Sequence, residues 1–205
     1  PLLYDTNLAA VGNPQAELPQ QFSAVQDVVA QLGKSVELYT QLFGKPPRGL
    51  WPSEGAVAQE IVPFVANAGY QWMASGEEVL ANSLGIGAFT RDAQDTVQQA
   101  DKMYRPYFVA APASSPIKGK PVLMVFRDGL ISDKLGFTYA GLPGKVAAAD
   151  VMRRLEAIRA QLKKEGASGP HLVSIILDGE NAWEHYDNDA KEFLNELYRL
   201  LAESA

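Results

Sequence analysis

The chain has 205 residues, no cysteine and a formal net charge of −6, and hydrophobic residues make up 47% of it. This composition excludes a disordered or collagen-like protein, and the missing thiols exclude disulfides, thiolate-bound zinc, iron–sulfur clusters and a cysteine nucleophile. An acidic chain without a run of Lys or Arg is a poor nucleic-acid binder. No stretch reaches the ~18 apolar residues of a membrane span, so we expect neither a nucleic acid nor a membrane as partner.

The first half of the chain is expected to alternate helices with short strands. Apolar residues three or four positions apart predict the first helix, which Gly44 closes, after the loop-like residues 1–19. Ser53 is expected to cap the second helix, and the stretch 84–105 is weakly patterned. The predicted helices cover 21–43, 57–68 and 77–82, and the predicted strands cover 48–52, 70–74 and 107–111.

The second half continues this alternation. The unbroken apolar run 122–126 predicts a strand buried on both faces, as in a parallel sheet, and 172–177 predicts a second buried strand. Helices are predicted over 151–162 and 193–201. Four or five strands alternating with helices indicate an α/β fold with a parallel sheet. Because a closed eightfold barrel takes ~250 residues, we expect a single domain over 1–205 that is part of a barrel.

Carboxylates follow three of the predicted strands. Glu54 comes after the first strand, Asp128 after the strand 122–126, and Asp178 and Glu180 after the last strand. Sites in parallel α/β folds form at the C-terminal ends of the strands, so we expect these acids to converge over one mouth. The aromatic residues expected to line this mouth are Trp51, Tyr139, Trp183 and Tyr186.

Paired carboxylates beside flat aromatic rings indicate a sugar site. A glycosidase uses two acids that flank the glycosidic bond, and aromatic rings contact the apolar faces of pyranoses. Arg127 is expected to orient the carboxylate of the neighbouring Asp128. Structural interpretations stay open: Glu54 as a first-turn helix acid and Asp128 as a turn former. The polar and aromatic segment 178–189 favours function more strongly, because such residues beside a buried strand are costly unless they are used.

A metal site is another interpretation of that segment. Its acids could hold a hard cation through carboxylate oxygens, although their spacing fits no EF-hand. His171 is expected only to begin a strand, and His185 has no histidine partner with which to build a metal site. We therefore expect neither a metal nor another cofactor. The acids concerned are Asp178, Glu180, Asp187 and Asp189.

The same residues resemble a known family. Residues 49–55 (GLWPSEG), 126–128 (FRD) with 132–137 (SDKLGF), and 178–186 (DGENAWEHY) are similar to the third, fourth and fifth motifs of glycoside hydrolase family 57. They occur in the family's order and are most similar to its α-amylase and amylopullulanase subgroup. The resemblance implies an incomplete (β/α)7 barrel, a retaining mechanism and α-glucan substrates such as starch, glycogen or maltooligosaccharides.

The resemblance also implies the roles of single residues. Glu54 would be the nucleophile. The acid/base would be Asp128, which follows its strand directly, with Asp133 in reserve because it lies farther into the loop. A retaining mechanism places the two carboxyls about 5–5.5 Å apart. The residues expected to bind the substrate are Trp51, Arg127, Asp178, Glu180, Asn181, Trp183, His185 and Tyr186.

The family's first two motifs, with an early histidine, have no counterpart here, because His171 and His185 both lie late in the chain. We therefore expect a partial catalytic barrel that lacks the N-terminal strands, with the N-terminal remainder of the same enzyme as its partner. The alternative to an enzyme is a non-catalytic carbohydrate-binding remnant of such a barrel. Hydrolysis is not distinguished from glucan transfer, and a cytoplasmic location is the default expectation, with secretion left open.

Overall fold

The computed structural model describes residues 1–18, 20–180 and 183–204. Their contacts group into two compact units. Unit 1 comprises Pro1–Ser75 and Pro106–Val125, and unit 2 comprises Gly76–Arg105 and Phe126–Ala205. No helix in the described ranges is long and apolar enough to cross a membrane. A single domain over 1–205 stays a prediction.

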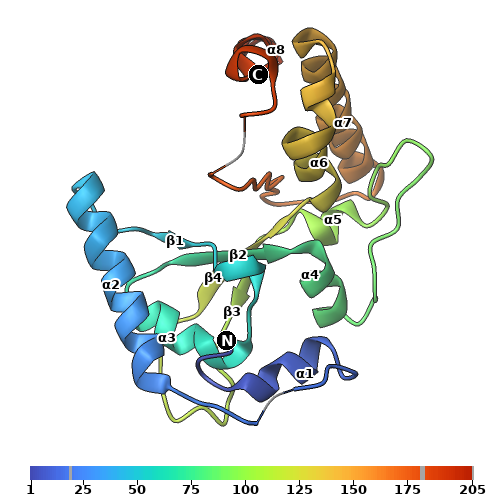
Figure 1. The fold of residues 1–205 in the computed structure, drawn as a ribbon. Helices are drawn as coiled ribbons and strands as arrows, with labels where there is room; N and C mark the ends of the chain where they lie inside the picture. The colour runs from blue at the N-terminus through green and yellow to red at the C-terminus, as the bar shows by residue number, and fades with distance from the viewer. Residues whose placement is uncertain (19, 181–182, 205) are drawn as a thin grey trace. The chain divides into compact units, whose positions relative to one another are not determined.

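Unit 1 is built on an open sheet with the strand order β1-β2-β4-β3 (Figure 1). β1 runs parallel to β2, whereas β3 runs antiparallel to β4. In the described residues we therefore find a mixed open sheet and not the predicted barrel of parallel strands. The physical reason is that the connection 110–121 between β3 and β4 contains no helix. Two consecutive parallel strands would need a crossover connection, usually a helix, between them. The strands are β1 (Gly49–Leu50), β2 (Trp72–Gly76), β3 (Tyr107–Val109) and β4 (Val122–Arg127).

The long helix of unit 1 is confirmed, together with its predicted end. Gly44 adopts the left-handed φ of 72° that suits a residue just beyond a helix, and its N–H donates to the carbonyl of Thr40. The apolar face of this helix is less covered than its periodicity suggests, because Val29 and Phe43 are 56% and 66% exposed. The helices of unit 1 are α1 (Ala9–Gly12), α2 (Val25–Phe43) and α3 (Val62–Asn67), with 3-10 turns at Thr6–Leu8, Ser53–Gly55 and Gln59–Ile61.

The predicted helix over 57–68 is wrong in its first half. Ser53 does not cap a long helix, because Glu54 and Gly55 both take left-handed φ values, of 57° and 63°, which end the helical turn there. Pro63 lies in the first turn of the helix that does form. Proline suits that position because it lacks the N–H that an interior position of a helix needs. Only α3 therefore forms, and Gly69 follows it with a positive φ of 100°.

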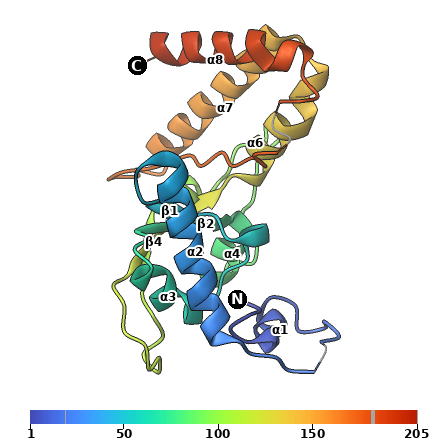
Figure 2. The same cartoon turned by 60° about the vertical axis from the view of Figure 1, so that its left-hand side comes forward.

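Unit 2 is built around its two longest helices. Figure 2 shows α7 and α8 as neighbours, and their contact buries Val151 and Phe193 in the apolar core of this unit. The helices of unit 2 are α4 (Glu77–Ser83), α5 (Ala100–Met103), α6 (Gly129–Asp133), α7 (Gly144–Lys164) and α8 (Lys191–Glu203). A π-helical turn covers Lys134–Thr138, and 3-10 turns cover Tyr139–Gly141 and Asp187–Ala190.

The predicted strand over 172–177 is reduced to a single bridge. Ser174 pairs with Arg127 in a parallel orientation, and the Asp128 N–H donates to the Ser174 carbonyl at 2.9 Å. Most of the segment is only half-buried, so its apolar residues did not suffice to build a regular strand. The segment nevertheless lies beside the end of β4, where the fourth motif begins.

A hydrogen-bond network around Asp150 stabilises α7. Asp150 Oδ2 accepts from the Tyr139 hydroxyl at 2.6 Å and from Arg154 Nε at 2.9 Å, and Oδ1 accepts from Arg153 Nη2 at 2.6 Å. Burial by itself would raise the pKa of Asp150, but these donors outweigh it and lower that pKa to about 2. The folded state therefore favours the ionised carboxylate.

Asp150→Asn should lower the free energy of unfolding at pH 7 by about 2 kcal/mol. A depressed folded pKa stabilises the fold above the unfolded value of ~4, and this stability is lost as the pH falls through about 2. The difference between wild type and variant should therefore shrink over that window in urea unfolding curves. Glu156→Gln, at an exposed position of the same helix, is the control; an equal loss in both variants would contradict the assignment.

Candidate active site

Glu54 lies in unit 1, in a tight turn that follows β1. Its φ of 57° and ψ of 21° are left-handed, a conformation that costs a non-glycine residue about 1–2 kcal/mol. The turn is held by a 2.9 Å bond from the Gly55 N–H to the Pro52 carbonyl and by the buried Ser75 hydroxyl, which donates to the Gly55 carbonyl at 2.6 Å. The backbone is thereby constrained while Glu54 remains exposed.

Trp51 precedes this turn on the same segment and is 41% exposed. Its ring lies against Gly55, because a Cβ on that glycine would come within 2.9 Å of the ring. Two features of this position therefore require glycine: its positive φ and the close approach of the Trp51 ring. The exposed acid and the half-exposed indole are thus fixed by one short segment.

Asp128 lies in unit 2 and is completely buried. As the N-cap of α6 it accepts the Ile131 N–H on Oδ1 at 3.0 Å, and it accepts the Tyr104 hydroxyl on Oδ2 at 2.6 Å. Burial, and then the charge of Asp128, raise the pKa of Tyr104 far above its usual range, so the phenol keeps its proton and donates. Both carboxylate oxygens are therefore engaged inside the unit.

Arg91 supplies the positive charge beside this buried carboxylate. Its Nη2 lies 3.3 Å from Asp128 Oδ1 and 2.7 Å from Glu77 Oε2. Burial opposes the charge of Arg91, but Asp128 and Glu77 outweigh this effect and raise its pKa. Burial also raises the pKa of Glu77, although the hydrogen bond from Arg91 counteracts it. One guanidinium thus serves two carboxylates.

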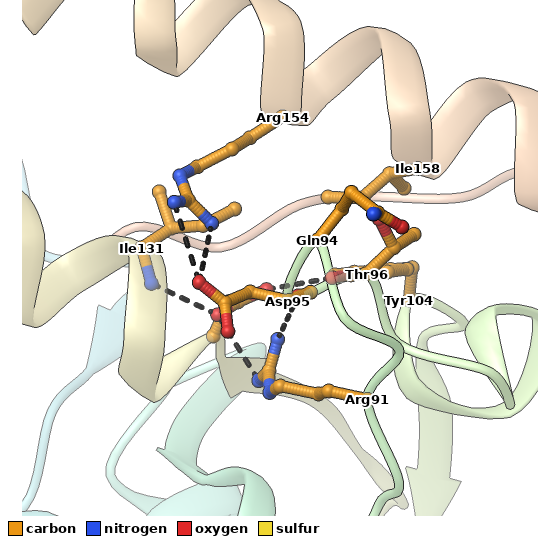
Figure 3. A pocket seen from close by; sticks show the side chains of 9 residues that line it. Arg91, Gln94, Asp95, Thr96, Tyr104, Ile131, Arg154 and Ile158 are labelled. Atoms are coloured by element: carbon orange, nitrogen blue, oxygen red, sulfur yellow. Dashed lines mark hydrogen bonds and ion pairs between the residues drawn. The ribbon is translucent and has the colours of Figure 1, made fainter.

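Asp128, Tyr104, Arg91 and Glu77 together form what we call the Asp128 cluster. A small pocket with room for about one water molecule adjoins it. Figure 3 shows Arg91, Asp95 and Arg154 pointing toward one another there, and Arg154 Nη1 lies 3.4 Å from Asp95 Oδ2. The pocket is too small for a pyranose ring, so it belongs to the support of Asp128 and not to a sugar subsite. Its lining is Arg91, Gln94, Asp95, Thr96, Tyr104, Asp128, Ile131, Arg154 and Ile158.

Arg127 does not orient the carboxylate next to it, contrary to our expectation. Its Nε donates to the Ile176 carbonyl at 2.9 Å, and its Nη2 binds Asp133 Oδ1 at 2.6 Å. The alternation of a strand explains this, because neighbouring side chains point to opposite faces. Asp133, the reserve acid/base, is 61% exposed, whereas Asp128 is fully enclosed.

The fifth-motif residues fall into two groups. Asp178, Glu180 and His185 are exposed, and His185 Nε2 lies 3.3 Å from the adjacent Glu184 Oε1. Asn181 lies outside the described residues. No three His, Asp or Glu side chains in the described ranges are arranged to hold a metal ion.

The aromatic residues of this motif lie in or against the core of unit 2. Tyr186 is buried, donates to the Leu135 carbonyl at 2.5 Å and packs against Phe193 at 5.5 Å between ring centroids. Burial raises the pKa of Tyr186 to about 12. Trp183 is half-buried with its ring centroid 5.6 Å from that of Tyr186, and Tyr139 is buried as well. Two of the aromatic residues expected at the mouth, Tyr139 and Tyr186, are therefore core residues.

Three residues of the Asp128 cluster were not singled out in the sequence. Glu77 carried a usable signal, because it directly follows β2 and so stands at a strand end like the other acids. Arg91 and Tyr104 carried none, since they lie in the weakly patterned stretch 84–105. The structure brings Asp128, Arg127 and Asp133 together in unit 2, whereas Glu54 and Trp51 belong to unit 1. The separation of Glu54 from Asp128 stays a prediction.

Tyr104→Phe should lower the free energy of unfolding by about 1.5–3 kcal/mol, because it removes a hydrogen bond to a buried carboxylate. Urea unfolding monitored by circular dichroism measures this change. Tyr198→Phe is the matched control, since Tyr198 is 65% exposed and its hydroxyl should contribute under about 0.5 kcal/mol. Equal stability of the two variants would show that the Tyr104–Asp128 bond has no net effect.

The sequence profile of one family, described as Glycosyl hydrolase family 57, matches residues 11–205. Among curated proteins, none matches the chain. The profile covers nearly the whole chain, including the turn of Glu54, the Asp128 cluster and the fifth-motif segment. Membership implies a retaining enzyme that hydrolyses or transfers α-glucans. The chain therefore belongs to glycosyl hydrolase family 57.

Proposed function

We propose that this chain carries the catalytic residues of an amylase- or amylopullulanase-type enzyme that acts on α-1,4 and also α-1,6 bonds of starch-like or glycogen-like glucans. The observation that carries the proposal is the turn of Glu54, where an exposed carboxylate is held on a left-handed backbone. Such backbone strain persists where the surroundings enforce it, and it clusters at functional sites. Trp51 beside it offers a half-exposed ring to a pyranose.

The chemistry follows from two carboxyls. Glu54 attacks the anomeric carbon while the acid/base donates a proton to the glycosidic oxygen, and the carbon–oxygen bond to the leaving sugar breaks. The acid/base, now a carboxylate, removes a proton from water or from an acceptor hydroxyl. That oxygen attacks the anomeric carbon and releases Glu54. Water gives hydrolysis, and a sugar hydroxyl gives glucan transfer.

Asp128 is our first assignment for the acid/base, and its support is its rigid position at the end of β4. Asp133 is the second, and its support is its exposure, because a proton donor must reach the glycosidic oxygen. We further propose that the exposed Asp178, Glu180 and His185 contact the sugar chain. Asn181 joins them by its place in the motif.

A carbohydrate-binding protein without turnover is the second candidate. The full burial of Asp128 favours it, because a general acid must contact the glycosidic oxygen and this carboxyl is not exposed. Binding of maltooligosaccharides without release of reducing ends would support this candidate.

Glu54→Gln in the complete gene product should reduce turnover of maltooligosaccharides on the order of 10⁴-fold, because the amide cannot form the glycosyl–enzyme ester. Release of reducing ends measures the rate, and a fluorosugar inactivator should label Glu54 in the wild type, as mass spectrometry of peptides would show. Glu37→Gln, at an exposed position of α2, is the control. Turnover that survives in Glu54→Gln would exclude this nucleophile.

Asp128→Asn should lower kcat/KM for maltooligosaccharides at least ~100-fold, yet lower kcat/KM for α-maltosyl fluoride less than ~10-fold, because kcat/KM reports formation of the glycosyl–enzyme and fluoride leaves without a proton. Steady-state kcat/KM values on both substrates make the comparison. Asp133→Asn is the matched variant. If only Asp133→Asn distinguishes the two substrates, the acid/base is Asp133.

A further inference from the structure

Arg91 connects the starts of two helices in unit 2. Its Nη2 lies 2.7 Å from Glu77 Oε2 and 3.3 Å from Asp128 Oδ1, and only 16% of its side chain is exposed. Glu77 is the first residue of α4, and Asp128 is the N-cap of α6. A single planar guanidinium thus holds both carboxylates, which an ammonium group with its point charge would do less specifically.

Glu77 extends this connection to the backbone of α6. Its Oε2 accepts the Gly129 N–H at 3.2 Å, directly after Asp128. Because burial works against the charge of Glu77, that carboxylate depends on the cation beside it. Arg91 therefore holds the first turn of α6 both directly and through Glu77.

The other arginines near the cluster are engaged elsewhere. Arg127 binds Asp133, and Arg154 binds Asp150 and Asp95. In the part of the chain that the structure describes, Asp128 forms its ion pair with Arg91. The orientation of the Asp128 carboxyl is thus set by Arg91 and the Ile131 N–H on Oδ1 and by the Tyr104 hydroxyl on Oδ2.

The Arg91 side chain is itself fixed by its own segment. Its Nη1 donates to the Asp95 carbonyl at 3.4 Å, and its backbone pairs with Val97 in an antiparallel bridge. Figure 3 shows the guanidinium pointing into the pocket beside Asp95. The guanidinium is therefore placed before any ligand arrives, as precise proton transfer requires.

We propose that Arg91 is a positioning residue that orients the carboxyl of Asp128 for proton transfer to the glycosidic oxygen, acting directly and through Glu77. This role rests on the proposed function, with Asp128 as the acid/base. Arg91, the ion-pair partner of Asp128, lies in the stretch between α4 and α5, outside the three motifs. Arg91 does not touch the substrate in this role.

Arg91→Met in the complete gene product should lower kcat for maltooligosaccharides about 100-fold, with KM changed less than ~3-fold, because proton transfer is impaired and binding is not. The kcat/KM for α-maltosyl fluoride should fall less than ~10-fold, since it reports formation of the glycosyl–enzyme and fluoride leaves without a proton. Arg91→Lys should recover part of kcat, and Glu77→Gln should show the same dependence on the leaving group in weaker form. Arg199→Met, whose partners Glu196 and Glu203 lie on α8, is the control that should leave both rates unchanged.

Parallel measurements on Asp128→Asn separate the positioning role of Arg91 from the assignment of Asp128 as the acid/base. If Asp128→Asn distinguishes the substrates and folded Arg91→Met slows both equally, Arg91 is only structural and the proposal fails. If Asp128→Asn does not distinguish them, the acid/base assignment itself fails, and the role of Arg91 falls with it. Thermal unfolding identifies variants that do not fold, and if neither Arg91 variant folds, a purely structural role replaces the proposal.

Discussion

The carboxylate of Asp128 is completely buried from bulk solvent, and unit 2 is arranged to compensate for that. A buried charge is tolerated only when it is paired and hydrogen-bonded. The Ile131 N–H, the Tyr104 hydroxyl and the Arg91 guanidinium meet this need from three different segments. Removing any one of them would leave the buried carboxylate with two of these three donors. The start of α6, and with it the fourth motif, therefore depends on this one carboxylate.

Two arginines, Arg127 and Arg91, bind different carboxylates of the fourth motif. Arg127 is adjacent to Asp128 in the sequence but binds Asp133 and the Ile176 carbonyl, so it connects the fourth motif to the segment before the fifth. Arg91, far away in the sequence, binds Asp128. Strand geometry separates neighbouring side chains, and tertiary packing brings distant ones together. An ion pair expected from adjacency was therefore replaced by one over a long separation.

The two proposed catalytic carboxyls are held by different physical means. Glu54 is exposed and is placed by its backbone, because the left-handed turn is constrained by Gly55, the buried Ser75 hydroxyl and the Trp51 ring. Asp128 is buried and is placed by donors to its own oxygens. A strained turn suits a nucleophile that must reach a sugar, and a satisfied network suits a carboxyl whose orientation must not change.

Local patterns predicted much of the secondary structure. The periodicity of α2, the glycine after it and the apolar run of β4 were sufficient, because helix ends and buried strands depend on nearby residues. The same approach failed at 57–68 and 172–177. There, left-handed residues, Pro63 and, among the described residues, the restriction of strand pairing to a single bridge decided the outcome.

By itself, the sequence determined the family, through motif residues at strand ends, and the absence of thiol chemistry, through composition. Only the tertiary structure decided that β3 runs antiparallel, that Tyr186 belongs to the core and that Arg91 and Tyr104 serve Asp128. The physical reason is the distance along the chain over which the interactions act. A motif shows which side chains are present within a short segment. Strand direction, burial and ion pairing depend on segments that meet only when the chain folds.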